Sequence, residues 1–190
     1  MLVQSGHTSP ITPFYTQIRA DECSRQMSLK CSPFSLLLPT SQGKSYLCNF
    51  VDTPGHPNFW DEVAAAFRLC DGVLLVVDAV EGLTHYGKFL IQQALRSRLE
   101  LVVVINKVDR LVLELKLPPG DAFFKIRHTL DEVNLAMEEI RVLGREIKQV
   151  NPVNGNVVLA SALFQTCFTL DSFSEKYKQL MAPPLSTSYQ

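Results

Sequence analysis

The sequence has no dense run of basic residues, no C-x-x-C pair and no long apolar run. Its 18 Lys and Arg residues against 19 Asp and Glu residues leave a net charge of -1. It therefore lacks the basic surface with which proteins grip nucleic acid phosphates. Its five cysteines are an odd number at irregular spacings, which predicts reduced thiols and neither a disulfide framework nor a zinc site. No apolar run approaches the roughly 20 residues of a membrane-spanning helix. We therefore expect no sequence-specific nucleic-acid binding and no membrane association.

The composition is that of a globular protein with one main core. The chain has 190 residues, of which 46% are hydrophobic and 19% charged, and a chain of this length buries about two-thirds of its unfolded surface. Residues 1–20 carry Pro10 and Pro13 without sustained periodicity, so we expect a poorly ordered N-terminal segment. The folded domain is expected over 21–182, and 183–190 is expected to be a C-terminal tail.

Apolar runs and helical spacings alternate along the chain. We expect strands over Phe34–Leu38, Ser45–Val51, Gly72–Asp78, Leu101–Ile105 and Asn156–Ala160. We expect helices over Phe59–Leu69, His85–Ser97, a long stretch from Asp121 as N-cap to Gly144 as stop, and Ser172–Met181. The alternation predicts an α/β fold, in which a mostly parallel sheet has helices on both faces and is opened by an antiparallel hairpin of the first two strands.

The first motif follows directly after the second expected strand. It reads Asp52, Thr53, Pro54, Gly55, His56. A carboxylate at a strand end can hold Mg²⁺ through its waters, and an amide of Gly55 that no side chain obstructs can donate to a terminal phosphate. His56 could then orient an attacking water. The alternative interpretation of these residues is an ordinary turn.

The second motif, Asn106-Lys107-Val108-Asp109, follows the strand expected over Leu101–Ile105. The carboxylate of Asp109 can accept both the N1-H and the N2-H of guanine, which discriminates against adenine. Asn106 can reach the other edge of the base, and the stem of Lys107 can cover the ring. A surface loop of mixed charge is the alternative.

A third motif strengthens the first two. Ser161, Ala162 and Leu163 close the last expected strand, where a backbone N-H could meet guanine O6. All three motifs lie at strand ends, and ligands of open α/β sheets bind at the carboxyl ends of the strands. The order of a phosphate motif, a guanine motif and a base-closing motif is the pattern of a GTPase domain.

Four longer stretches of the sequence resemble one branch of the GTPases. They read K-S-Y-L-C-N-F-V-D-T-P-G-H over 44–56, N-K-V-D-R-L over 106–111, L-E-L-K-L-P-P over 113–119 and K-I-R-H over 125–128. They resemble the large spliceosomal GTPases of the U5 small nuclear ribonucleoprotein, relatives of the ribosomal translocases. The resemblance implies a P-loop-NTPase-type G domain, GTP or GDP with Mg²⁺ as cofactors, U5 and other spliceosome proteins as partners, and a nuclear role in pre-mRNA splicing. The alternative is a cytoplasmic translocase of the elongation factor type.

The resemblance also assigns roles to single residues. It implies Asp52 and Ser28 as Mg²⁺ ligands, with Ser28 standing where translocases carry a threonine, and His56 as the catalytic residue that positions water. The residues that it assigns to GTP binding are Asp52, Thr53, Pro54, Gly55, Asn106, Lys107, Asp109, Ser161, Ala162 and Leu163.

One motif of the family is missing from the sequence. No GxxxxGK[ST] loop is present to cradle the phosphates, and the single Gly43-Lys44-Ser45 is more simply a hairpin turn. The strand that precedes this loop in the family, between the strands ending at Asp52 and Asp78, is missing too. We expect the flanking strands to pair directly, or a partner to complete the sheet, or the chain to be a truncated product. Two hypotheses follow: a GTPase, or a non-enzymatic interaction module derived from one.

Overall fold

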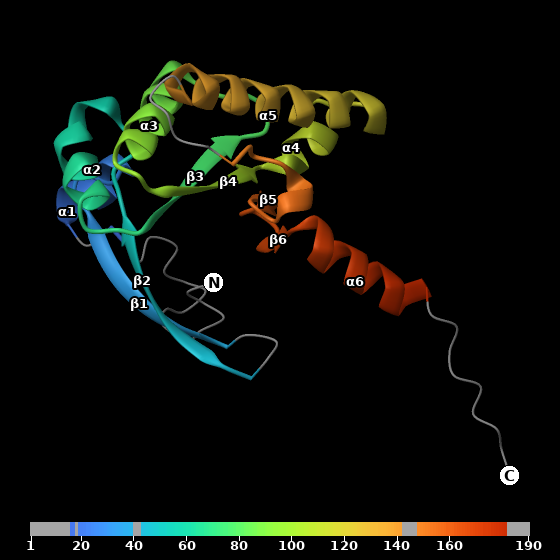
Figure 1. Cartoon of the computed structure of the whole chain (residues 1–190), viewed down its shortest axis with the longest axis horizontal. Helices are drawn as coiled ribbons and strands as arrows, with labels where there is room; N and C mark the ends of the chain where they lie inside the picture. The colour runs from blue at the N-terminus through green and yellow to red at the C-terminus, as the bar shows by residue number, and fades with distance from the viewer. Residues whose placement is uncertain (1–15, 18, 40–42, 142–147, 182–190) are drawn as a thin grey trace, which may run out of the picture. The chain divides into compact units, whose positions relative to one another are not determined.

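A computed structural model describes residues 16–17, 19–39, 43–141 and 148–181 (Figure 1). The chain divides into two units, Met1–Cys70 and Asp71–Gln190, and each is described by itself. Most of the N-terminal segment expected over 1–20, the tail expected over 183–190 and the helix stop expected at Gly144 lie outside the described residues. No described helix is long and apolar enough to cross a bilayer.

The first unit is built around a β-hairpin. Its elements are α1 (Ala20–Arg25), β1 (Ser32–Pro39), β2 (Ser45–Asp52), the 3-10 turn η1 (Pro57–Phe59) and α2 (Trp60–Phe67). β1 and β2 pair antiparallel from Ser32 opposite Asp52 to Pro39 opposite Ser45. Gly43 has a φ of 77°, a left-handed conformation that glycine adopts without strain, and Ser45 begins β2. The predicted hairpin and the following helix are thus confirmed, while residues 40–42 of its turn lie outside the described residues and α1 was not predicted.

The hairpin has a small buried side. Leu36 of β1 is fully buried, and Val63 and Ala66 of α2 are also buried. Phe34 and Phe50 lie opposite each other across the ladder, and their rings stack with centroids 5.3 Å apart. Among the described residues of this unit few large apolar side chains are fully buried, and carboxylates hold the segment between α1 and β1.

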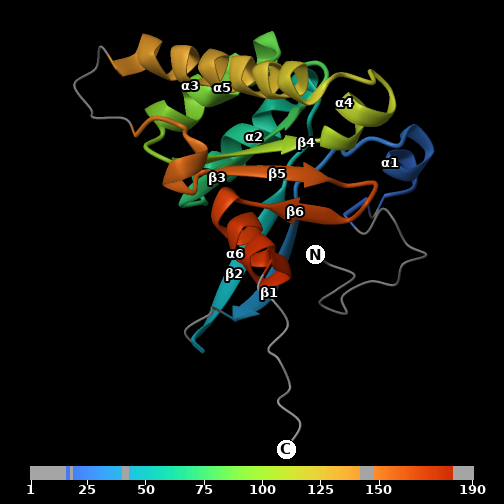
Figure 2. The ribbon, with the colours of Figure 1, turned by 90° about the vertical axis from the view of Figure 1, so that its right-hand side faces the viewer.

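The second unit contains a four-stranded sheet and the longer helices. Its elements are β3 (Gly72–Asp78), α3 (His85–Arg96), β4 (Glu100–Asn106), α4 (Val108–Leu113), α5 (Pro119–Arg141), η2 (Pro152–Asn154), β5 (Val157–Ser161), β6 (Thr166–Phe168) and α6 (Leu170–Met181). The sheet order is β3-β4-β5-β6, with β3, β4 and β5 parallel and β6 antiparallel (Figure 2). The predicted strands and helices of this unit are confirmed. β6 and α4 were missed, because three and six residues are too few for a periodic pattern.

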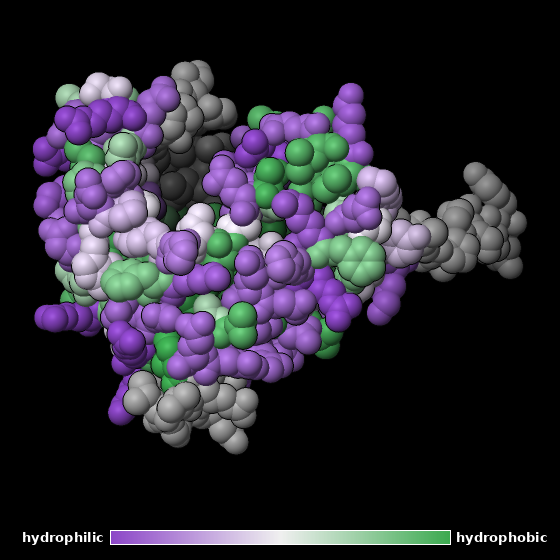
Figure 3. Space-filling model, turned by 90° about the horizontal axis from the view of Figure 1, so that it is seen from above, coloured by the Kyte–Doolittle hydropathy of each residue, from purple (hydrophilic) through white to green (hydrophobic). Residues whose placement is uncertain are grey.

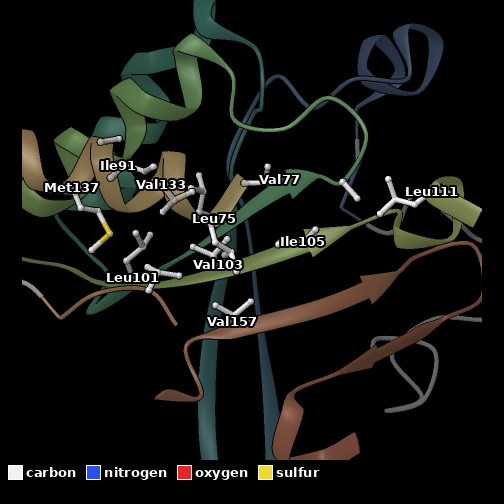
Figure 4. Close-up of a cluster of buried hydrophobic side chains, with 14 residues drawn as sticks. Leu75, Val77, Ile91, Leu101, Val103, Ile105, Leu111, Val133, Met137 and Val157 are labelled. Carbon is white, nitrogen blue, oxygen red and sulfur yellow. The ribbon is translucent and has the colours of Figure 1, made fainter. Parts of the chain in front are cut away.

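The core of this unit lies between the sheet and the layer formed by α3 and α5 (Figure 4). Along β3 and β4, core residues alternate with residues that are less buried. The residues labelled in Figure 4 are Leu75, Val77, Ile91, Leu101, Val103, Ile105, Leu111, Val133, Met137 and Val157. On the other side of β3, Leu74 and Val76 are 56% and 62% exposed. Seen from above in Figure 3, the surface is mostly hydrophilic with separate hydrophobic groups.

Two details differ from the sequence predictions. α5 begins at Pro119, because proline is favoured in the first turn of a helix, so Asp121 lies inside that turn and is not the N-cap. The hairpin of β1 and β2 forms a two-stranded sheet of its own and does not open the parallel sheet. The direct pairing of the strands ending at Asp52 and Asp78, one of the three alternatives, is therefore not found among the described strands.

Candidate functional site

The guanine motif and the base-closing motif lie at the ends of neighbouring strands. Asn106 is the last residue of β4 and Ser161 the last residue of β5. The two strands are parallel, with Ile105 opposite Leu159, so their carboxyl ends meet at one edge of the sheet. The buried side chains of Val103 and Ile105 anchor β4 directly before the motif.

Asp109 is held by the third motif. The hydroxyl of Ser161, a buried residue, donates a hydrogen bond of 2.5 Å to Oδ1 of Asp109. Ser161 Oγ in turn accepts from the backbone N-H of Phe164 at 3.3 Å. Oδ2 of Asp109 has no hydrogen-bond partner among the described residues and can accept from the N-H groups of a guanine edge.

Asn106 is fixed through its amide oxygen. Oδ1 accepts from the backbone N-H of Lys107 at 2.8 Å and from that of Ala162 at 3.1 Å. These two bonds orient the amide, so that the Nδ2 group keeps two N-H donors for a base. Because the N-H of Ala162 points at Asn106, the backbone N-H of Leu163 is the next donor in this turn that can meet a carbonyl oxygen of a ligand.

Lys107 occupies an unusual conformation. Its φ is 61°, in the left-handed region that residues with a Cβ adopt rarely. Its ammonium Nζ lies 2.9 Å from Oδ2 of Asp78, the last residue of β3. Arg110, one residue after the motif, also reaches Oδ2 of Asp78 through Nη1 at 3.3 Å.

Asp78 was not predicted as a site residue. It is only partly exposed, and this burial pushes the pKa of its carboxyl upward. Hydrogen bonds from Lys107 and from the backbone N-H groups of Val80 and Glu81 outweigh the burial, so the net pKa lies below its usual value. The carboxylate therefore remains ionised at neutral pH. The position of Asp78 at a strand end was the one sequence feature that could have indicated it.

The phosphate motif follows β2 in the first unit. Asp52 ends the strand, and the side chain of Pro54 is fully buried beneath the turn. Gly55 is exposed, and a Cβ built on it would meet nothing within 4 Å. A side chain at position 55 would therefore meet no steric obstacle among the described residues, and the role of the Gly55 N-H toward a phosphate stays a prediction.

His56 is exposed, and its ring is held on one side. Nδ1 accepts from the backbone N-H of Asn58 at 3.2 Å, which caps η1, and the ring lies 6.0 Å from that of Phe59. A ring nitrogen that accepts a hydrogen bond carries no proton, so Nε2 carries the N-H of the neutral imidazole. His56 can then donate to a water through Nε2.

Ser28 lies in the segment between α1 and β1, which two carboxylates hold. Glu22 is 1% exposed and accepts from the backbone N-H groups of Leu29, Lys30 and Arg19 at 2.8, 3.0 and 3.2 Å. These bonds, that of Leu29 above all, lower the pKa of the Glu22 carboxyl. This anchor was missed because it joins residues seven and eight positions apart without a recognisable motif.

The second carboxylate is Glu62 of α2. It accepts from Nζ of Lys30 at 2.5 Å and from the backbone N-H of Cys31 at 3.3 Å. The side chain of Ser28 is half-buried, and its predicted role as a Mg²⁺ ligand stays a prediction. The described residues contain no group of three or more His, Cys, Asp or Glu side chains that could hold a metal.

The structure thus brings five of the predicted residues together through two sets of hydrogen bonds, one to Oδ1 of Asn106 and one between Ser161 and Asp109. We call these residues the guanine cluster, and its members are Asn106, Lys107, Asp109, Ser161 and Ala162. The phosphate-side residues, 52–56 and Ser28, belong to the first unit, and their geometry is described only within that unit.

Comparison with known proteins decides the family. The model of the "Elongation factor Tu GTP binding domain" matches residues 5–182. The chain belongs to this family. A crystal structure of the bacterial selenocysteine-specific elongation factor EF-Sec superposes with a TM-score of 0.57 at 18% identity, over 86% of this chain and 23% of that one. That likeness shows the G-domain fold.

Curated relatives narrow the resemblance. The chain is 47% identical over 166 residues to the 110 kDa U5 small nuclear ribonucleoprotein component CLO of Arabidopsis thaliana, covering 87% of this chain and 17% of the relative. It is 44% identical to the pre-mRNA-splicing factor cwf10 of Schizosaccharomyces pombe, over 86% of this chain and 16% of the relative. The predicted resemblance to the U5 branch is confirmed, and the chain spans about a sixth of the length of these relatives.

Proposed function

We propose that the chain is the guanine-nucleotide-binding part of a U5 small nuclear ribonucleoprotein component that acts in pre-mRNA splicing in the nucleus. The observation that carries the proposal is the guanine cluster. Ser161 holds Asp109, and Ala162 holds Asn106, as a site that reads both edges of guanine requires. The family's GTP-binding description and the U5 relatives support the ligand class and the partners.

In this proposal Asp109 accepts from N1-H and N2-H of guanine, and Nδ2 of Asn106 donates to the opposite edge. Adenine offers an acceptor at N1 and no N2-H group, so it would leave the carboxylate unpaired. Lys107 covers the face of the base with its methylene stem. The backbone N-H of Leu163 is available to O6.

The phosphate side is proposed to act through the first unit. The backbone N-H of Gly55 would donate to the terminal phosphate, and Nε2-H of His56 would orient a water beside it. Asp52 and Ser28 would hold Mg²⁺, which supplies charge neutralisation at the phosphates when it is bound. Thr53 and Pro54 fix the turn between Asp52 and Gly55.

The affinity for triphosphate is proposed to be weak. The sequence contains no GxxxxGK[ST] loop, and such a loop supplies charge-assisted contacts to the β- and γ-phosphates. We therefore assign nucleotide binding to this chain and not rapid hydrolysis.

Competition against a fluorescent GTP analogue tests the ligand class. We expect a dissociation constant no tighter than about micromolar, with displacement by GDP at least tenfold more effective than displacement by ADP. Equal displacement by the two nucleotides would refute guanine recognition, and nanomolar binding that depends on Mg²⁺ would refute the weak phosphate side.

A second candidate function is association with ribosomes. It is favoured by 37% identity over 184 residues to ribosome assembly protein 1 of Schizosaccharomyces pombe, covering 87% of this chain and 18% of the relative. The two candidates separate when the tagged full chain is recovered from cells and its RNA is measured. U5 small nuclear RNA in the recovered fraction supports splicing, and ribosomal RNA in its place supports the second candidate.

A further inference from the structure

Asp78 uses both of its carboxylate oxygens in the second unit. Oδ1 accepts from the backbone N-H groups of Val80 and Glu81 at 2.8 and 3.4 Å. Oδ2 accepts from Nζ of Lys107 at 2.9 Å and from Nη1 of Arg110 at 3.3 Å. One oxygen therefore fixes the turn after β3, and the other holds two cations from the segment that carries the guanine motif.

The backbone around Asp78 is fixed by packing. Its neighbours Val77 and Ala79 are buried in the core beneath α3 and α5. Asp78 lies opposite Asn106 in the parallel ladder, and the backbone N-H of Ala79 donates to the carbonyl of Asn106 at 2.9 Å. The carboxylate is thus presented to the guanine motif from a rigid strand end.

Lys107 depends on such an anchor. Its left-handed φ of 61° is uncommon for a residue with a Cβ, and it persists only where surrounding contacts hold it. Its backbone N-H donates to Asn106, and its carbonyl accepts from the backbone N-H of Arg110 at 3.0 Å. Its ammonium forms the ion pair with Asp78. Arg110 has a second partner, Glu114, at 2.7 Å.

We propose that Asp78 is a positioning residue for guanine recognition, holding the ammonium of Lys107 so that the lysine stem stays against the face of the bound purine. The inference rests on the proposed function. A lysine stem has four rotatable bonds, and fixing its far end before the nucleotide arrives lowers the entropy that binding must remove. Asp78 acts on the face of the base, whereas Asp109 reads its edge.

The test uses the full chain with Asp78→Asn, Lys107→Met and the double variant, and it measures GDP binding by calorimetry. We expect each single variant to bind GDP about 5–10-fold more weakly, because the coupling of a charged hydrogen-bonded pair is of this order. The double variant should bind no more weakly than the weaker single variant. Asp71→Asn, the same change at the exposed opposite end of β3, is the control and should bind as the unaltered chain does.

A second readout separates positioning from a general structural role. Asp78→Asn should weaken GDP and inosine diphosphate by the same factor, because the lysine stem covers both bases, and should leave their ratio unchanged. If the substitution instead disordered the whole site, the ratio of the GDP affinity to the inosine diphosphate affinity would fall. If Asp78→Asn does not fold, GDP binding by Lys107→Met tests the positioning role of Asp78 instead. Methionine keeps an unbranched apolar side chain and removes the ammonium that Asp78 holds.

The outcomes are distinct. If the unaltered chain binds GDP no better than ADP, the proposed function itself fails. If it prefers GDP but Asp78→Asn or Lys107→Met binds GDP unchanged, or if the two losses multiply in the double variant, only the positioning role of Asp78 is overturned.

Discussion

The two units order their site residues by different means. In the second unit the guanine cluster follows β4 and β5, whose inward side chains belong to one apolar core under α3 and α5. In the first unit the phosphate motif follows a two-stranded hairpin, and a hairpin alone is marginally stable in water. The segment that carries Ser28 is tied by two carboxylates, Glu22 and Glu62. The guanine cluster of the second unit is therefore held by core packing, and the phosphate motif of the first unit by polar contacts.

The largest effect is expected from the core that supports the guanine cluster. Leu75 is buried at 7% exposure, and its neighbour Leu74 lies on the opposite side of β3. Leu75→Ala should lower the free energy of unfolding of the second unit by about 2–5 kcal/mol, because it leaves a cavity. Leu74→Ala is the matched control and should cost less than about 1 kcal/mol. Chemical denaturation measures both, and equal losses would contradict the assigned core.

The next largest effect concerns the base edge. Asp109→Asn removes the carboxylate that pairs two guanine N-H groups and should weaken GDP binding roughly 10–100-fold, since hydrogen bonds to a charged group contribute about 1.5–3 kcal/mol. The new amide can donate to the C2 oxygen of xanthine, so the preference should move toward xanthosine diphosphate. Calorimetry with both nucleotides measures the ratio. An unchanged ratio would show that this loop does not read the base.

A smaller loss of GDP affinity is expected at Ser161, which contacts Asp109 and not the base. Ser161→Ala removes the hydroxyl that holds Asp109 and should weaken GDP binding about 2–10-fold. The loss is smaller than for Asp109→Asn because the hydroxyl orients the carboxylate and does not itself pair with the base. Ser174→Ala is the matched control, because its exposed hydroxyl donates only to the backbone carbonyl of Asp171 within α6. If Ser161→Ala binds as tightly as the control, the Ser161 contact does not orient the carboxylate.

The smallest effect concerns the polar contacts of the first unit. The native pKa of Glu22 is lowered, so its stabilising contribution is present at a pH above its ordinary pKa of about 4.3. That contribution is lost as the pH falls through the lower native pKa. The amide proton shifts of Leu29 and Lys30 should therefore move in an NMR titration as the pH falls below the ordinary glutamate pKa of about 4.3. They should stop titrating in Glu22→Gln and titrate normally in Glu138→Gln, an exposed control on α5. Persistent titration in Glu22→Gln would assign the effect to another group.

Sequence reasoning predicted the features that depend on local pattern. The strands before Asp52, Asn106 and Ser161 are mostly apolar runs, and the motifs at their ends have fixed spacing, so the fold class could be predicted and the residues of the guanine cluster could be proposed. Glu22 has no such pattern, and of Asp78 only the position at a strand end was visible in the sequence. Their roles arise from contacts that only the folded backbone creates, such as the ion pair that joins Asp78 to Lys107.

The remaining features that the sequence did not predict depend on which strands are neighbours in the sheet and which of their sides is covered. The bond between Asp109 and Ser161 joins residues 52 positions apart and depends on β4 and β5 being parallel neighbours, which the sequence implied only through the family resemblance. The exposed side of β3 at Leu74 and Val76 could not be predicted either. A continuous apolar run reads as a strand that is buried on both faces.

A series of ligands that differ only in their phosphates measures how much of the binding free energy comes from the base. We propose calorimetry of the full chain with guanosine, GMP, GDP and GTP in the presence of Mg²⁺. Because the guanine cluster is held by core packing and the sequence contains no GxxxxGK[ST] motif, guanosine should retain the affinity of GTP to within about tenfold, or about 1.4 kcal/mol. A rise of a hundredfold or more from guanosine to GTP would show that the phosphate side dominates and would contradict the account.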